Sequence, residues 1–135
     1  MDRNPSAVKC ARLNVDRNPS TPRVTVLQSD LFESVDGRFD LIVFDPPFRW
    51  FAPRDLLEAA MTDANYRAMT EFFREADRHL APDGRLLIFF GSSGDLGYLR
   101  RLAGENGFAA EVVAREELVR DDWTVEYLTF RMTRA

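Results

Sequence analysis

The chain has 135 residues, of which 45% are hydrophobic and 12% aromatic, so it suits one ordinary domain and is too apolar for a disordered chain. Its single cysteine and single histidine exclude an intramolecular disulfide, a cysteine-based zinc site and a histidine-rich metal site, so we expect no metal. The net charge of −4 argues against a surface that binds nucleic acid all over. The sequence has neither a signal peptide nor a membrane-spanning apolar run, so we expect a cytoplasmic protein without a membrane partner.

The first part of the chain predicts one helix and two strands. Residues 4–5, Asn-Pro, are typical of a helix start, and the apolar residues behind them recur at helical spacing over residues 5–14. Residues 24–28 are predicted as a short strand, and residues 39–44 as a central strand that is buried on both faces. The sequence Asp-Pro-Pro-Phe at 45–48 ends this strand, because two prolines cannot continue it.

The second part alternates helical and strand patterns in the same way. The predicted elements are a helix from residue 66 to 80, a turn at 83–84, a buried strand at 85–90, a helix at 95–105, and strands at 108–114 and 124–132. The last two strands are joined by a short connection and should pair antiparallel. Alternation of this kind indicates an α/β fold, and residues 1–135 are predicted to be a single domain.

The strongest functional motif is the Asp-Pro-Pro-Phe sequence, at the edge where open α/β sheets bind their ligands. Pro46 and Pro47 have no N–H donors, so the carbonyl oxygens beside them remain available as acceptors. A planar NH₂ group can donate one hydrogen to the Asp45 carboxylate and the other to the Pro46 carbonyl, which directs the nitrogen lone pair at an electrophile. The carboxylate would offset positive charge that develops on this nitrogen, and Phe48 could stack on the planar group.

This motif resembles the signature of class I S-adenosylmethionine-dependent amino-methyltransferases, Asp/Asn-Pro-Pro-aromatic after an apolar strand. Release-factor glutamine methyltransferases and small-domain rRNA guanine-N2 methyltransferases are such enzymes, and DNA adenine-N6 methyltransferases share the motif. The resemblance implies a Rossmann-like sheet, S-adenosylmethionine as cofactor, and a catalytic role for residues 45–48. It covers nearly the whole chain, because residues 2–8 and 29–32 resemble the motifs after the second and third strands. There, Asp2 would bind the cofactor ribose, and Asp30 with Leu31 would contact its adenine.

The sequence departs from this family's pattern in two ways. The first strand, the Gly-rich loop and the first helix should precede Asp2, so the resemblance implies an N-terminally truncated, partial methyltransferase domain. Such a sheet has exposed strand edges that can pair with a second copy or with a complementing chain. In addition, Asp45 stands where glutamine-methylating relatives usually have Asn, whereas Asp is more familiar in nucleobase methylation. The acceptor stays open between a glutamine amide of a release-factor-like protein and an exocyclic amine of an rRNA or DNA base.

Two further segments have competing interpretations. Arg49, Trp50 and Arg54 follow the motif, and arginines interleaved with aromatics can clamp a substrate nucleobase and its phosphate or can pack the loop onto the sheet. Residues 91–97 superficially resemble a dinucleotide-binding loop, but their G-x-x-G-x-x-G spacing favours a turn and a helix start near the substrate or the cofactor.

The predicted function is transfer of a methyl group from S-adenosylmethionine to a planar nitrogen. The alternative is a non-catalytic remnant or binding module of a methyltransferase, which cannot bind the cofactor alone.

Overall fold

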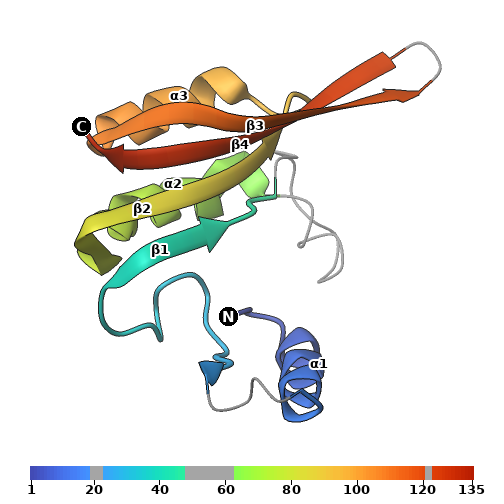
Figure 1. Ribbon diagram of the computed structural model, residues 1–135, viewed down its shortest axis with the longest axis vertical. Coiled ribbons are helices and arrows are strands. Elements are labelled where there is room, and N and C mark those ends of the chain that lie inside the picture. The colour runs from blue at the N-terminus through green and yellow to red at the C-terminus, as the bar shows by residue number, and fades with distance from the viewer. Residues whose placement is uncertain (19–22, 48–62, 121–122) are drawn as a thin grey trace. The chain divides into compact units, whose positions relative to one another are not determined.

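The computed structural model describes residues 1–18, 23–47, 63–120 and 123–135 (Figure 1). The chain divides into two compact units, Met1–Gly37 and Arg38–Ala135. The first unit contains helix α1, Pro5–Asp16. The elements of the second unit are β1 (Phe39–Phe44), η3 (Ala64–Tyr66), α2 (Arg67–Ala76), η4 (Asp77–His79), β2 (Leu80–Gly91), α3 (Leu96–Glu105), β3 (Phe108–Arg120) and β4 (Trp123–Arg134). Within the described ranges, no helix is long and apolar enough to cross a bilayer.

Helix α1 confirms the helix predicted from residue 5 and continues it to Asp16. The Asn4 side chain accepts a hydrogen bond from the backbone N–H of Ser6 at 2.9 Å, and Pro5 occupies the first helical position. These two local signals define the start of the helix, as the sequence predicts. Val8, on the predicted apolar stripe, is buried.

The prediction of a strand at residues 24–28 is wrong. Gln28 forms a single parallel bridge with Asp2 instead of a strand. The Asp2 N–H donates to the Leu27 carbonyl at 3.2 Å, and the Ser29 N–H donates to the Asp2 carbonyl at 3.0 Å. A strand needs a neighbour with which to continue its hydrogen bonds, and within the described part of this unit only the few residues around Asp2 pair with the segment.

The sheet of the second unit has the strand order β1-β2-β4-β3 (Figure 1). β1 and β2 are parallel, whereas β4 runs antiparallel to both β2 and β3. This arrangement confirms the predicted α/β class with its C-terminal antiparallel pair. Phe44 at the end of β1 lies opposite Ile88 near the end of β2, so the two parallel strands terminate at one edge of the sheet.

Strand β1 forms where it is predicted, but it is not buried on both faces. Ile42 is buried, whereas Leu41 and Val43 are 41% and 55% exposed. β1 is the last strand on its side of the sheet, and α2 and α3 lie on one side of the sheet (Figure 1). Phe44 stacks on Phe72 of α2, with ring centroids 4.2 Å apart, and this contact covers the face that is buried.

Strand β2 begins at Leu80 rather than at the predicted residue 85, and the Asp-Gly pair at 83–84 lies inside it. The pairing partners change from Phe39–Leu80 to Leu41–Arg85, so the expected turn is accommodated as an irregularity in the strand. Gly84 permits this close approach, because a Cβ atom there would lie 2.8 Å from the Phe39 carbonyl oxygen.

An arginine from the far end of the chain holds this irregular segment. The Arg134 guanidinium donates to the carbonyl oxygens of Leu80, Ala81 and Pro82 at 2.9, 2.6 and 2.8 Å. It also donates to the Asp77 carboxylate at 2.6 Å. The start of β2 therefore depends on a residue at the end of β4.

The structure confirms the apolar face of the helix predicted at residues 66–80. The α-helix itself is shorter than predicted. The residues that recur at helical spacing are all buried: Tyr66, Met69, Phe72, Phe73, Ala76 and Leu80. The α-helix itself covers Arg67–Ala76, and η3 and η4 are 3-10 turns at its two ends. Helix α3 and the C-terminal strand pair are also confirmed, with β3 and β4 longer than predicted. Residues 121–122, predicted as the turn between them, lie outside the described residues.

Candidate active site

The segment Asp45-Pro46-Pro47 directly follows β1 at the carboxyl edge of the parallel strand pair. Pro46 is fully buried, Pro47 is half-buried and Asp45 is exposed. The buried proline anchors the segment against the sheet, while Asp45 remains accessible to a ligand. The structure thus places these three residues at the edge that the sequence predicts for them.

Partial burial raises the pKa of the Asp45 carboxyl above its ordinary value of 3.8. Burial removes water from the carboxylate and so disfavours its charged form. A carboxylate that has lost part of its hydration gains more from an N–H donor than a fully hydrated one does. The electrostatics of Asp45 therefore suit an acceptor of hydrogen bonds from an amine.

Four of the predicted site residues cannot be located in this way. Phe48, predicted to stack on the acceptor, and Arg49, Trp50 and Arg54, predicted to bind substrate, lie outside the described residues. Their roles stay predictions from the sequence.

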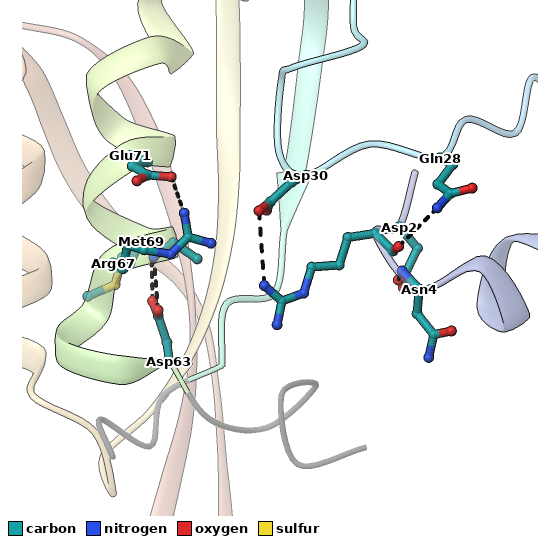
Figure 2. Close-up of polar contacts among 10 residues, drawn as sticks. Asp2, Asn4, Gln28, Asp30, Asp63, Arg67, Met69 and Glu71 are labelled. Carbon is teal, nitrogen blue, oxygen red and sulfur yellow. Dashed lines mark hydrogen bonds and ion pairs between the residues drawn. The ribbon is translucent and has the colours of Figure 1, made fainter. Parts of the chain in front are cut away.

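The first unit brings the two predicted cofactor acids onto neighbouring segments. The bridge between Asp2 and Gln28 places Asp2 beside the segment that leads to Asp30. Figure 2 shows both side chains. The Arg3 Nη1 atom lies 4.0 Å from Asp30 Oδ2, and the Asp2 carboxylate accepts a hydrogen bond from the Asn4 N–H at 2.7 Å. This ion pair is loose and exposed, so it contributes little to stability.

Leu31 adopts a left-handed backbone conformation, with a φ of 50°. This conformation costs a non-glycine residue on the order of 1 kcal/mol, so the surrounding turn has to hold it. Ser29, which is buried, does so with its hydroxyl: it donates to the Leu31 carbonyl at 2.8 Å and accepts from the Ser34 N–H at 2.9 Å. The turn after residue 28 is therefore built to a defined shape.

The donor and acceptor chemistry of this turn fits the adenosine end of S-adenosylmethionine. Ribose hydroxyls and the adenine amine are hydrogen-bond donors, and Asp2 and Asp30 offer carboxylate acceptors for them. Asp2 is exposed and Asp30 is half-buried. In the described part of the chain, no cluster of three or more metal-ligating side chains occurs.

The structure adds a recess that the sequence did not identify. Its volume is about 450 Å³, and it is lined by Asn65, Tyr66, Ser93, Gly94 and Asp95. The sequence indicates Tyr66 as core and residues 91–97 as a turn near substrate or cofactor, but nothing in it marks Asn65 or pairs the two segments. Asn65 and Tyr66 both have a φ of 53°, and helical periodicity does not reveal such a break. The one available signal is Asp95, an acid directly before a helical pattern.

The sequence model of the family described as "Methyltransferase small domain" matches residues 1–117. A ribosomal RNA small subunit methyltransferase C of Pasteurella multocida is 41% identical over 63 residues, which are 47% of this chain and 16% of that protein. A Methanocaldococcus jannaschii protein, provisionally named protein N5-glutamine methyltransferase, is 46% identical over 48 residues, which are 36% of this chain and 23% of that protein. The alignments thus span a minor part of these relatives' lengths.

The solved structures agree on the fold. The crystal structure of ribosomal protein L11 methylase from Lactobacillus delbrueckii subsp. bulgaricus is similar to this chain with a TM-score of 0.62 and 18% sequence identity. The similarity covers 98% of this chain and 55% of that chain, and at this level of identity it shows a shared fold alone. Since the family's sequence pattern runs through most of the chain, from residue 1 to 117, the chain belongs to the methyltransferase small domain family.

Proposed function

We propose that this protein transfers a methyl group from S-adenosylmethionine to a planar nitrogen. The observation that carries the proposal is the position of Asp45-Pro46-Pro47 at the carboxyl end of β1, next to the end of the parallel strand β2. Membership of a methyltransferase family supports the reaction class. The names of two relatives give rRNA and the N5 atom of glutamine as targets, and nucleobases and glutamine both carry planar NH₂ groups.

In this mechanism the chain orients the acceptor rather than reacting with it. The Asp45 carboxylate and the Pro46 carbonyl each accept one hydrogen from the acceptor NH₂ group, which holds the nitrogen lone pair in a single direction. When bound, S-adenosylmethionine would supply the electrophilic methyl group: the N–C bond forms as the C–S bond breaks, S-adenosylhomocysteine leaves with the bonding electron pair, and the methylated nitrogen then releases one of its protons to water. As the nitrogen gains positive charge, the Asp45 carboxylate stabilises it. Phe48 stacks on the planar group, and Pro47 keeps the segment rigid.

The remaining predicted residues divide between cofactor and substrate. Asp2 accepts hydrogen bonds from the ribose hydroxyls of the cofactor, and Asp30 with Leu31 contacts the adenine. Arg49, Trp50 and Arg54 bind the substrate. Asp45 stands where glutamine-methylating relatives usually have Asn, and this resemblance to nucleobase methyltransferases favours an exocyclic amine of an RNA or DNA base over a glutamine amide.

Calorimetric titration of the 135-residue chain with S-adenosylmethionine tests the cofactor, and radiolabelled methyl transfer to small-subunit rRNA, DNA or a glutamine-containing peptide tests the reaction. We expect saturable binding and label in the nucleic acid. Asp45→Ala should lower the transfer rate about 100-fold or more and leave the cofactor Kd unchanged, since it removes charge stabilisation at the acceptor alone. Asp30→Ala should weaken cofactor binding instead.

Asp83→Ala is the matched control, because Asp83 is an exposed acid before the regular part of β2, away from its carboxyl end, and should change neither quantity. Absence of both heat and label would contradict the proposal and favour the non-catalytic binding module.

The open edge of β1 supports a second proposal, which is that β1 pairs with a strand of another chain. Among the described residues, β1 pairs in the sheet with β2 alone, and Leu41 and Val43 are exposed along it. Unpaired backbone groups on an edge strand with exposed apolar residues promote strand pairing. Size-exclusion chromatography with light scattering should therefore detect a mass above that of one chain as concentration rises, and a single constant monomer mass would contradict this.

A further inference from the structure

The recess lined by Asn65, Tyr66, Ser93, Gly94 and Asp95 lies at the end of the sheet that also carries Asp45. β2 ends at Gly91, directly before the loop that carries Ser93 and Asp95. Phe44 and Ile88 are paired, so the chain leaves β1 and β2 at neighbouring points of the same edge. The Tyr66 ring lies 6.4 Å from the ring of Phe90, the second-last residue of β2. The recess therefore lies at the edge where the candidate catalytic segment ends.

The two walls of the recess are held together by specific contacts. The backbone N–H of Asp95 donates to the Tyr66 hydroxyl at 3.0 Å, and the Tyr66 ring stacks on Tyr98 at 5.2 Å. The Asp95 carboxylate accepts from the Tyr98 N–H at 2.8 Å, which holds the start of α3. These contacts join the start of α2 to the start of α3, so the recess has a defined width.

Asp63 holds the wall that carries Asn65. Its buried carboxylate accepts hydrogen bonds from the backbone N–H groups of Ala68 and Met69 at 2.9 and 3.0 Å (Figure 2). Asn65 and Tyr66 are thus kept in their left-handed conformation by a residue that precedes them and by the helix that follows. Such strained residues persist where their surroundings determine them, and they are common at ligand sites.

The lining chemistry selects the kind of group that fits. It consists of an amide, a hydroxyl, a carboxylate, a phenol and the backbone of a glycine, and no Arg or Lys of the described residues lines the recess. A phosphate would meet the Asp95 carboxylate without a compensating cation, so the recess disfavours it. A neutral planar group with N–H donors matches both the amide and the carboxylate. A volume of about 450 Å³ lies in the range of small-molecule sites.

We infer that this recess receives the acceptor nucleobase, with Asn65 and Asp95 as the residues that determine which base edge is accepted. Tyr66 is a positioning residue that acts through Asp95. The inference rests on the proposed methyl transfer to a planar nitrogen, and it extends the site from Asp45 to the start of α2 and α3. The recess is open, because Asn65, Ser93 and Asp95 are exposed, so a base that lies in it would leave its phosphates outside, where other residues can bind them.

Two substitutions remove the proposed contacts and preserve the backbone. Asn65→Gly deletes the side chain at a residue with φ of 53°, a conformation that glycine adopts readily. Asp95→Asn removes the charge and keeps a side chain that can cap α3. Asp83→Asn is the matched control, because it makes the same chemical change at an exposed acid of β2 that does not line the recess.

Fluorescence anisotropy of labelled probes measures binding without requiring activity. The probes are a single-stranded RNA, a DNA of the same sequence and a glutamine-containing peptide. We expect each of the two variants to raise the Kd for RNA and DNA about tenfold, and the control to leave it unchanged. In a transfer assay, the same variants should raise KM for the acceptor and leave the calorimetric Kd for S-adenosylmethionine unchanged.

Three results would overturn the assignment of the recess. The first is unchanged nucleic-acid binding in both variants. The second is weaker binding of RNA alone, which would show that the recess recognises ribose rather than the base, and the third is weaker binding of the peptide alone. Failure of the wild-type chain to bind either nucleic acid would overturn it as well. Failure of the wild-type chain to bind S-adenosylmethionine contradicts the proposed function instead, and the probe titrations still decide the recess.

Discussion

At the scale of single residues, Asp45 combines an accessible position with partial loss of water. Its folded pKa is raised by burial, so the folded state favours the neutral carboxyl more than the unfolded state does. Its contribution to stability is therefore fully present below pH 3.8 and is lost as the pH rises through the raised pKa. At neutral pH, the partly buried charge of Asp45 therefore lowers the stability of the folded state, although the proposed mechanism needs this residue in its charged form.

This reasoning predicts the effect of Asp45→Asn on stability. At about pH 7 the variant should be as stable as the wild type or more stable, because it has no charge to desolvate. As the pH falls towards 3.8, the wild type should gain stability relative to the variant. Urea unfolding across this range measures both free energies. A variant that is less stable at neutral pH, by an amount that does not change with pH, would contradict the assigned cause.

Gly84 is a second residue whose identity is determined by its surroundings. A Cβ atom there would lie 2.8 Å from the Phe39 carbonyl oxygen and 2.9 Å from Leu80 Cγ, so Gly84→Ala should destabilise the fold by about 1–3 kcal/mol. Gly104→Ala is the control, since nothing lies within 4 Å of a Cβ atom at that helical position. The control should gain about 0.5–1 kcal/mol. Equal unfolding free energies for the two variants would contradict the claim that a side chain at position 84 collides with Phe39 and Leu80.

At the scale of elements, α2 depends on the residue that precedes it. Asp63 is 6% exposed and accepts two backbone N–H groups at the helix start. Asp63→Ala should cost about 1–2 kcal/mol, because both donors lose their partner in a buried place. Asp63→Asn keeps one oxygen acceptor and should lose less. Thermal unfolding followed by circular dichroism measures the relative stabilities of the wild type and the two variants. An alanine variant as stable as the wild type would show that the Asp63 cap contributes nothing to stability.

At the scale of the whole molecule, the two units differ in how much apolar surface they bury. Of the described residues, Val8 and Phe32 are the buried apolar side chains of Met1–Gly37, whereas Arg38–Ala135 buries a core of aromatic and aliphatic side chains between its sheet and helices. Local opening requires less free energy where less apolar surface is buried.

We therefore predict that α1 amides exchange with solvent faster than those of β2 and β4. Hydrogen exchange followed by mass spectrometry measures this difference, and S-adenosylmethionine should slow exchange around Asp2 and Asp30. Equal protection of α1 and β4 without the cofactor would contradict the prediction.

The sequence by itself determined the features that depend on neighbouring residues. The start of α1 follows from Asn4-Pro5, and the end of β1 follows from two prolines, because caps and proline act within a few residues. The class of the fold follows from the alternation of strand and helix patterns. The candidate catalytic segment could be identified for the same reason, since it is contiguous in the chain.

Only the tertiary structure decided what depends on residues far apart. The edge position of β1 is set by the strand order of the described sheet, and the early start of β2 is held by Arg134, which is 53 residues from Ala81 in the sequence. Residues 24–28 have strand composition without a strand, because backbone hydrogen bonds need a partner that local pattern does not report. The recess likewise joins Asn65 to Asp95 across two helix starts, and no local sequence signal encodes that distance.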